Sequence, residues 1–237
     1  MLNIPATAFE DTGDLRREVI ATCLLMHDDL GYFISTWGNI SVRLADGLLV
    51  TPTRIGYEEL RPEDLVVISW RGERLKGERL PTSEVELHRQ ILLERPDFAA
   101  IIHHHGPWTT VCACAQRTIP VIADDIAEII GGPVFCSRHV AAGRHHELAE
   151  AARRAIGRDA TAVLLANHGA LVGARTLTEA IAACQVLEKA AMALVHAEAL
   201  GGAKPIGEAL WREERERYLY RYGKAEDLAG VIKSKMD

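Results

Sequence analysis

Apolar residues recur at helical spacing near both ends of the chain. The first such segment starts at Asp14 and stops at Gly31, and a glycine there suits the left-handed residue that commonly follows a helix. The second segment is longer, and Thr176 and Glu179 at its start have the spacing of a capping box. The predicted buried faces consist of Leu15, Val19, Cys23 and Met26 in the first helix and Ile181, Cys184, Leu187 and Leu194 in the second.

Two shorter helices are predicted in the middle of the chain. Ser83 and Glu86 have capping-box spacing, and Pro96 lies just beyond the segment that they open, so a helix is predicted to start at Ser83. The segment "PWTTVCACAQ" is also predicted to be helical, with Pro107 in its first turn.

Runs of β-branched and apolar residues predict strands between these helices. "NISVRL" and "GLLVTPT" flank Asp46-Gly47, which is a strong hairpin signal, and "DLVVISW" follows as a third strand. "FAAIIHHHG" has the pattern of a buried strand, and "ATAVLLANHGALVG" is an apolar strand interrupted at residues 167–169. Strands and helices alternate without a strict βαβ rhythm, so the pattern indicates a mixed α/β fold with an antiparallel meander in its first half.

The composition favours one domain that acts on a small molecule. The 237 residues are 48% hydrophobic and show no linker, so residues 1–237 are expected to form one domain. The net charge is −6 with acidic and basic residues interleaved, which argues against nucleic acid as a partner. No apolar run reaches the roughly 20 residues of a membrane span and no signal peptide is evident, so we expect a cytoplasmic protein that binds no membrane. Five cysteines without a C-x-x-C pair favour neither disulfides nor a structural zinc site.

Three consecutive histidines carry the candidate chemistry. Side chains alternate along a strand, so His103 and His105 are expected to point to one side and His104 to the other. His168 stands at a break in the last apolar strand, where it can reach a common site, and Glu84 supplies a carboxylate from the first turn of its helix. Three imidazoles and one carboxylate match the ligands of zinc or another divalent transition ion.

Five short segments give the chain a resemblance to a known family. "WGNISVR", "VTPTRIGY", "LPTSEVELH", "IIHHHGPWT" and "LANHGALV" stand in the order and spacing of the class II aldolase/adducin family, and the motifs are most similar to those of the L-fuculose-phosphate-type aldolases. The resemblance covers about residues 10–225. It implies an α/β/α layered fold around a largely antiparallel sheet, in a homotetramer whose active sites lie between subunits.

The resemblance also assigns roles to individual residues. It implies one divalent metal ion per subunit, with zinc first and manganese, cobalt or iron as alternatives. The implied metal ligands are His103, His105, His168 and Glu84, the last also as acid or base. The implied phosphate-binding residues are Asn39, Thr53, Arg54, Thr82 and Ser83.

Two positions depart from the family pattern and one agrees with it. Arg54 stands where the family usually has glycine, and it can bind either a phosphate or a carboxylate. Asp124 stands where the fuculose-type aldolases have tyrosine and the related pentulose phosphate epimerases have aspartate. Tyr222 matches the C-terminal tyrosine that donates a proton in the fuculose-type enzymes, on a tail of about residues 205–237 that is expected to reach toward the active site.

The function that the resemblance implies is cleavage of a ketose 1-phosphate to dihydroxyacetone phosphate and an aldehyde. The sugar is expected to be 5-deoxyribulose, 5-methylthioribulose or fuculose 1-phosphate. Asp124 and Arg54 leave two other reactions of the family open, namely methylthioribulose-1-phosphate dehydration and a decarboxylation. An adducin-like interaction module without catalysis is a third reading, and the intact set of metal ligands counts against it.

Overall fold

The computed structural model describes residues 5–222. Within this range seven strands form one sheet in the order β4-β3-β2-β1-β5-β7-β6, and every neighbouring pair is antiparallel. The strands are β1 (Asn39–Arg43), β2 (Gly47–Val50), β3 (Val66–Ser69), β4 (Arg74–Lys76), β5 (Ala100–His104), β6 (Ala162–Leu165) and β7 (Gly169–Ala174). The predicted antiparallel sheet is thus confirmed.

Six α-helices and five short 3-10 or π segments connect these strands in the described range. The α-helices are α1 (Gly13–Leu24), α2 (Val85–Glu94), α3 (Pro107–Cys114), α4 (His145–Ile156), α5 (Leu177–Ala197) and α6 (Glu208–Tyr220). The shorter segments are η1 (Leu25–Asp29), η2 (Tyr57–Glu59), η3 (Pro62–Asp64), η4 (Ile126–Ile130) and η5 (Glu198–Leu200).

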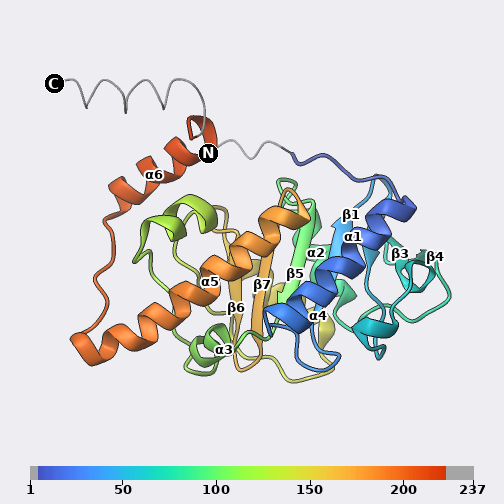
Figure 1. Cartoon of the computed structure of the whole chain (residues 1–237), viewed down its shortest axis with the longest axis horizontal. Coiled ribbons are helices and arrows are strands. Elements are labelled where there is room, and N and C mark those ends of the chain that lie inside the picture. Colours follow the sequence, from blue (N-terminus) through green and yellow to red (C-terminus); the bar gives the residue numbers. More distant parts are fainter. Residues whose placement is uncertain (1–4, 223–237) are drawn as a thin grey trace.

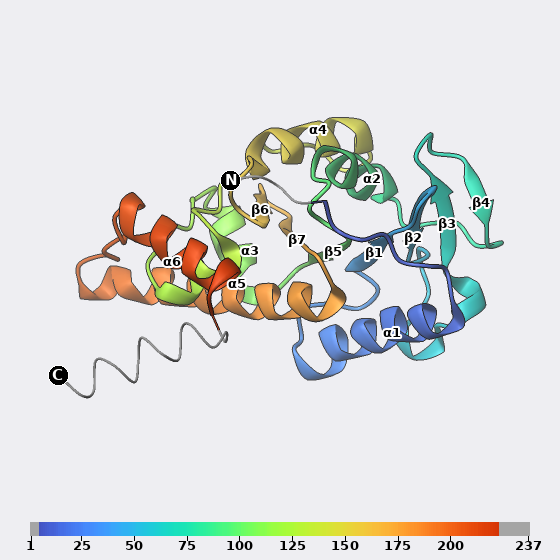
Figure 2. The ribbon, with the colours of Figure 1, turned by 90° about the horizontal axis from the view of Figure 1, so that it is seen from above.

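The helices cover both faces of the sheet. Helices α1 and α5 lie across one face (Figure 1), and the view from above shows α2 and α4 on the opposite face (Figure 2). Each face has its own apolar cluster, because alternate strand residues point to opposite sides. In β5, for example, Ile102 packs on the α1 and α5 side and Ile101 on the α2 and α4 side. The α/β/α layering is therefore confirmed.

Several local patterns form the elements that they predict. Gly31 follows the first helix with φ +64°, and Asp46-Gly47 turns β1 into β2. Thr176 caps α5, because its hydroxyl accepts the Glu179 N–H. The predicted helical faces are buried, except that Ile181 is half-buried against the same apolar cluster.

The predicted start of helix α2, at Ser83, is wrong. Helix α2 begins at Val85 with Glu84 as its N-cap, and the side chain of Ser83 does not cap it. The Glu86 carboxylate accepts hydrogen bonds from Arg89 and Gln90 rather than closing a capping box. The Thr82 hydroxyl accepts the Glu84 N–H instead, which leaves the Glu84 side chain free to point away from its helix.

The last apolar segment also differs from its prediction. It forms the β6–β7 hairpin rather than one interrupted strand, and Asn167 in its turn has φ +57°. An asparagine tolerates this left-handed backbone better than most residues do. The turn brings His168 to the end of the sheet.

Helix α5 with its η5 extension, Leu177–Leu200, is the one described helix long and apolar enough to cross a membrane. Its Cys184, Leu187 and Leu194 side chains are buried in the apolar cluster of the sheet, as in the core helix of a globular domain. All five cysteines are free thiols in the described part of the chain.

Candidate metal and substrate site

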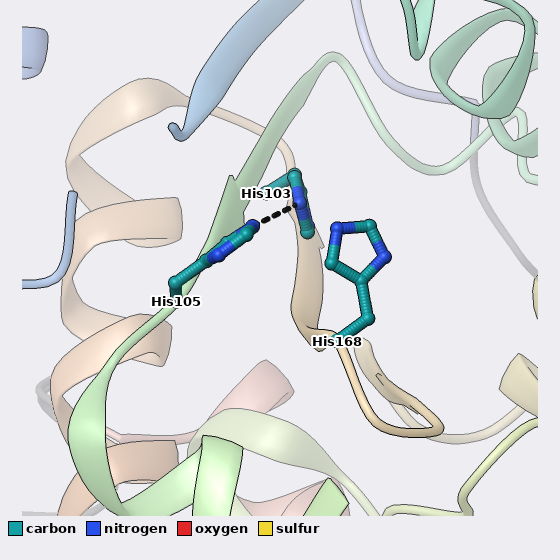
Figure 3. A group of neighbouring side chains, drawn as sticks. All are labelled: His103, His105 and His168. Carbon is teal, nitrogen blue, oxygen red and sulfur yellow. Dashed lines mark hydrogen bonds between the residues drawn. The ribbon is translucent and has the colours of Figure 1, made fainter. Parts of the chain in front are cut away.

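Three histidines converge at one end of the sheet. His103 and His105 come from the end of β5 and the residue after it, and His168 comes from the β6–β7 turn (Figure 3). One nitrogen from each ring lies within 4.8 Å of the others. His104 is fully buried on the other side of the strand, where its Nδ1 atom accepts the Gly106 N–H. The alternation predicted for the three consecutive histidines is confirmed.

Hydrogen bonding fixes which nitrogen of His103 can bind a ligand. Its Nδ1 atom lies 2.9 Å from the carbonyl oxygen of Ala170, which can only accept, so Nδ1 carries the proton. In the neutral ring the Nε2 atom then carries the lone pair, and it faces the Nε2 atom of His105 at 2.9 Å. A backbone bond that orients one nitrogen while the other is free is typical of histidines that bind metals.

Glu84 completes the group from the N-cap of α2. Its Oε2 atom lies 3.2 Å from His103 Nε2, and its Oε1 atom lies 3.3 Å from His168 Nε2. Burial alone would raise the pKa of Glu84, but the His103 and His168 imidazoles and a hydrogen bond from Asn39 outweigh burial and lower this pKa to about 2. Glu84 is therefore an anion at neutral pH.

Two of the three imidazoles, those of His105 and His168, are kept in their uncharged form. Burial, together with the neighbouring His103 ring, lowers the pKa of His105 to about 3 and that of His168 to about 4. Neutral imidazole is the form that binds a metal. Three imidazole nitrogen donors and one carboxylate fit a divalent transition ion such as zinc and leave coordination positions for a substrate.

A cavity of about 680 Å³ opens over this group. The predicted phosphate-binding residues all line it, together with three of the predicted ligands: Asn39, Thr53, Arg54, Thr82, Ser83, Glu84, His105 and His168. Arg54 is exposed and has φ +59°, a backbone conformation that glycine adopts without strain. The arginine thus keeps the backbone geometry that a glycine would favour and adds a cation to the cavity wall.

Asp124 and Tyr222 lie away from this cavity in the same chain. Asp124 is exposed, and Tyr222 lines a separate cavity of about 370 Å³ beside helix α6. Neither residue is among those that line the cavity over the histidines. The predicted tail is described only as far as residue 222, and residues 223–237 lie outside the described range.

Sequence patterns alone missed two features of the site. A histidine at the position of His88 in a predicted helix is expected to lie on a helix face or at the surface. His88 is instead fully buried, and its Nε2 atom lies 2.5 Å from Oδ1 of Asn39. Its position four residues after Glu84 on the same helix is the signal that could have revealed it. Residues 139–145 form a second wall of the cavity, which no motif marked.

Comparison with known proteins places most of the chain in one family. Residues 17–195 match the model of the class II aldolase and adducin N-terminal domain.

Two curated relatives and one solved structure are similar to this chain over most of their length. The 5-methylthioribulose-1-phosphate/5-deoxyribulose-1-phosphate aldolase of Rhodospirillum rubrum is 38% identical over 81% of this chain and 84% of its own. The L-fuculose phosphate aldolase of Escherichia coli is 36% identical over 77% of this chain and 78% of its own. A solved L-fuculose 1-phosphate aldolase superposes with a TM-score of 0.82 at 32% identity, over 88% of this chain and 98% of that one.

Proposed function

The chain belongs to the class II aldolase and adducin family, and we propose that it is a divalent-metal-dependent aldolase that cleaves a ketose 1-phosphate to dihydroxyacetone phosphate and an aldehyde. The observation that carries this proposal is the group of three imidazoles and one ionised carboxylate at a cavity with anion-binding side chains.

Cleavage of the bond between C3 and C4 of the sugar leaves negative charge on the fragment that becomes dihydroxyacetone phosphate. A divalent ion held by His103, His105 and His168, zinc first among the candidates, supplies Lewis-acid stabilisation of that charge. Glu84 carries a proton to C3 of the fragment in cleavage and removes it in the reverse reaction. Its ionised state suits the removal, and its contact with two histidines places it beside the reacting atoms.

The phosphate group is assigned to the wall formed by β1, the loop after β2 and the residues before α2. Thr53, Thr82 and Ser83 offer hydroxyl or N–H donors there, and Arg54 adds a guanidinium that can form a paired contact with a phosphate. We assign Arg54 to phosphate rather than to a carboxylate, because these neighbouring donors belong to the same wall.

The opposite wall indicates the aldehyde end of the substrate. Val140, Ala141, Ala142 and Leu148 line part of it, beside His139, Arg144 and His145, and these apolar side chains suit a methyl or methylthio group at the end of the sugar. This supports 5-deoxyribulose 1-phosphate and 5-methylthioribulose 1-phosphate as the substrates, which release acetaldehyde and methylthioacetaldehyde. The relative from Rhodospirillum rubrum is named for these two sugars.

We further propose that the enzyme works as a homotetramer in the cytoplasm. Asp124 and Tyr222 would then reach the cavity of a neighbouring subunit, where Tyr222 would take the proton of the C4 hydroxyl in cleavage and return it to the aldehyde oxygen in the reverse reaction, with Asp124 assisting in proton transfer. The free cysteines support a reducing compartment, since disulfides are typical of oxidising ones.

A panel of three sugars tests the proposal. The metal-loaded protein is given 5-deoxyribulose, 5-methylthioribulose or fuculose 1-phosphate, and dihydroxyacetone phosphate is measured through coupled oxidation of NADH. We expect release from the first two sugars that stops when a chelator removes the metal. Consumption of methylthioribulose 1-phosphate without dihydroxyacetone phosphate would instead identify a dehydratase, and no reaction with any sugar would overturn the proposal.

A further inference from the structure

A series of hydrogen bonds between buried side chains ends on Glu84. The Ser41 hydroxyl lies 2.7 Å from Nδ1 of His88, and Nε2 of His88 lies 2.5 Å from Oδ1 of Asn39. The Asn39 amide nitrogen then donates to Glu84 Oε2 at 2.8 Å. Ser41 and His88 are fully buried and Asn39 is 6% exposed, so water cannot replace these bonds.

The chemistry of the groups fixes the direction of every hydrogen bond. Glu84 is an acceptor, so the Asn39 NH₂ group faces it and the Asn39 carbonyl oxygen faces His88. That oxygen can only accept, which puts the His88 proton on Nε2. Nδ1 of His88 therefore accepts from the Ser41 hydroxyl, and each of the four groups is satisfied in this one arrangement only.

The register of the sheet connects this series of hydrogen bonds to the metal ligands. Asn39 in β1 is the cross-strand partner of His103 in β5, and Ser41 lies two residues further along the same face. If the Asn39 amide turned over, its oxygen would face Glu84 Oε2 at about the same distance, and two acceptors repel each other there. The Nε2–H group of His88 opposes that rotation, because it donates to the Asn39 oxygen.

We propose that His88 is a positioning residue for the metal site, which holds the Asn39 amide so that its NH₂ group keeps the Glu84 carboxylate turned toward His103 and His168. This inference rests on the proposed metal site but not on the proposed reaction. His88 does not line the substrate cavity, and its hydrogen bonds go to Ser41 and Asn39, so we assign its effect on the site to the Asn39 amide and, through it, to Glu84.

Two substitutions distinguish the effect of the His88 N–H donor from the effect of the side-chain volume. His88→Gln keeps an N–H that can reach Asn39, whereas His88→Met has similar volume and no donor. In competition with a chelator, we expect His88→Met to lower zinc affinity about 10- to 100-fold. We expect His88→Gln to stay within about threefold of the wild-type affinity, because it restores the same donor. Thermal melting of the metal-free proteins shows whether each variant is folded.

The zinc titrations overturn the proposal in two cases. Wild-type zinc affinity in His88→Met would show that no donor is needed, and equal losses in both variants would show that only the shape of the ring counts. Because no sugar is used, failure here is distinct from failure of the proposed aldolase reaction.

Neutron diffraction on crystals of the wild-type protein is independent of any variant. It distinguishes nitrogen from oxygen in the Asn39 amide and locates the deuterium on His88. We expect deuterium on Nε2 and none on Nδ1. Deuterium on Nδ1, or an Asn39 amide with its oxygen toward Glu84, would overturn the proposal.

Discussion

The Glu84 Oε2 atom lies 3.2 Å from the Nε2 atom of His103, although the two residues come from a helix cap and a central strand. This contact exists because α2 begins one residue later than Glu84, so the carboxylate points away from its own helix. The Oε1 atom meanwhile faces His168 at 3.3 Å. One carboxylate thus joins the β5 strand and the β6–β7 turn into a single site.

Glu84→Gln keeps the volume of the side chain and removes its charge. We expect a zinc affinity at least about tenfold lower and a kcat at least about 100-fold lower, because a ligand and a proton carrier are lost together. Zinc competition and the NADH-coupled assay measure the two effects. Glu86→Gln is the matched control on the same helix, since Glu86 pairs with Arg89, and its activity should be unchanged. Wild-type activity in Glu84→Gln would contradict the assignment.

Arg54 predicts opposite effects on stability and on substrate binding. Because Arg54 has φ +59°, Arg54→Gly should raise the free energy of unfolding by about 1 kcal/mol. The same change should raise the KM of the sugar phosphate about tenfold through loss of the guanidinium. Arg54→Ala is the control, because it removes the guanidinium and keeps the strain, so only KM should rise. An unchanged KM in both variants would remove Arg54 from the phosphate site.

Much of the site follows from local patterns. Alternation along a strand was sufficient to place His103 and His105 together and His104 apart, and the interrupted apolar run located His168 at a break. The layered antiparallel fold also agreed with the resemblance carried by five motifs. The placement of the histidines depends on residues close in sequence, so periodicity is enough to predict it, whereas the α/β/α layering is implied by the resemblance alone.

Other features depend on packing between distant segments, which periodicity does not contain. A histidine on a helix gives no sign of burial, yet α2 packs His88 against Ser41 and Asn39 of β1. The capping box at Ser83 failed for a similar reason, since Arg89 and Gln90 compete for the Glu86 carboxylate. Tyr222 likewise lines a different cavity of its own chain, beside helix α6, which no local pattern indicates.

Asp11 predicts an acid-dependent loss of stability. Hydrogen bonds from Arg16 lower its pKa against the effect of burial, and Lys76 lowers it further. The pKa of an aspartate in the unfolded chain is about 3.9. Because the pKa of Asp11 in the folded protein is lower, its ionised form stabilises the protein at pH values above about 3.9. This contribution is lost as the pH falls through the folded-state pKa. Asp11→Asn should therefore cost about 2 kcal/mol at pH 7, and the difference from wild type should shrink below about pH 4.

Urea denaturation at several pH values measures the Asp11 effect. The control is Asp14→Asn, because Asp14 pairs with Arg17 while its side chain is 92% exposed. Such a pair contributes about 0–1 kcal/mol. A difference for Asp11→Asn that stays constant down to pH 3 would contradict the account.

Mixing two inactive variants tests whether active sites lie between subunits. Glu84→Gln and Tyr222→Phe are co-expressed, and activity of the mixed oligomer is compared with that of each variant alone. If Tyr222 acts across an interface, random mixing restores about a quarter of the sites, since each restored site takes Glu84 and Tyr222 from different chains. If no activity returns, Tyr222 does not act on a neighbouring site.

Proton exchange at C3 of dihydroxyacetone phosphate tests the central claim most directly. The metal-loaded protein is incubated with this compound in D₂O without any aldehyde, and NMR follows the C3 protons. The account predicts that one of the two protons exchanges, and that a chelator or Glu84→Gln abolishes the exchange. No exchange with the metal-loaded wild-type protein would contradict it.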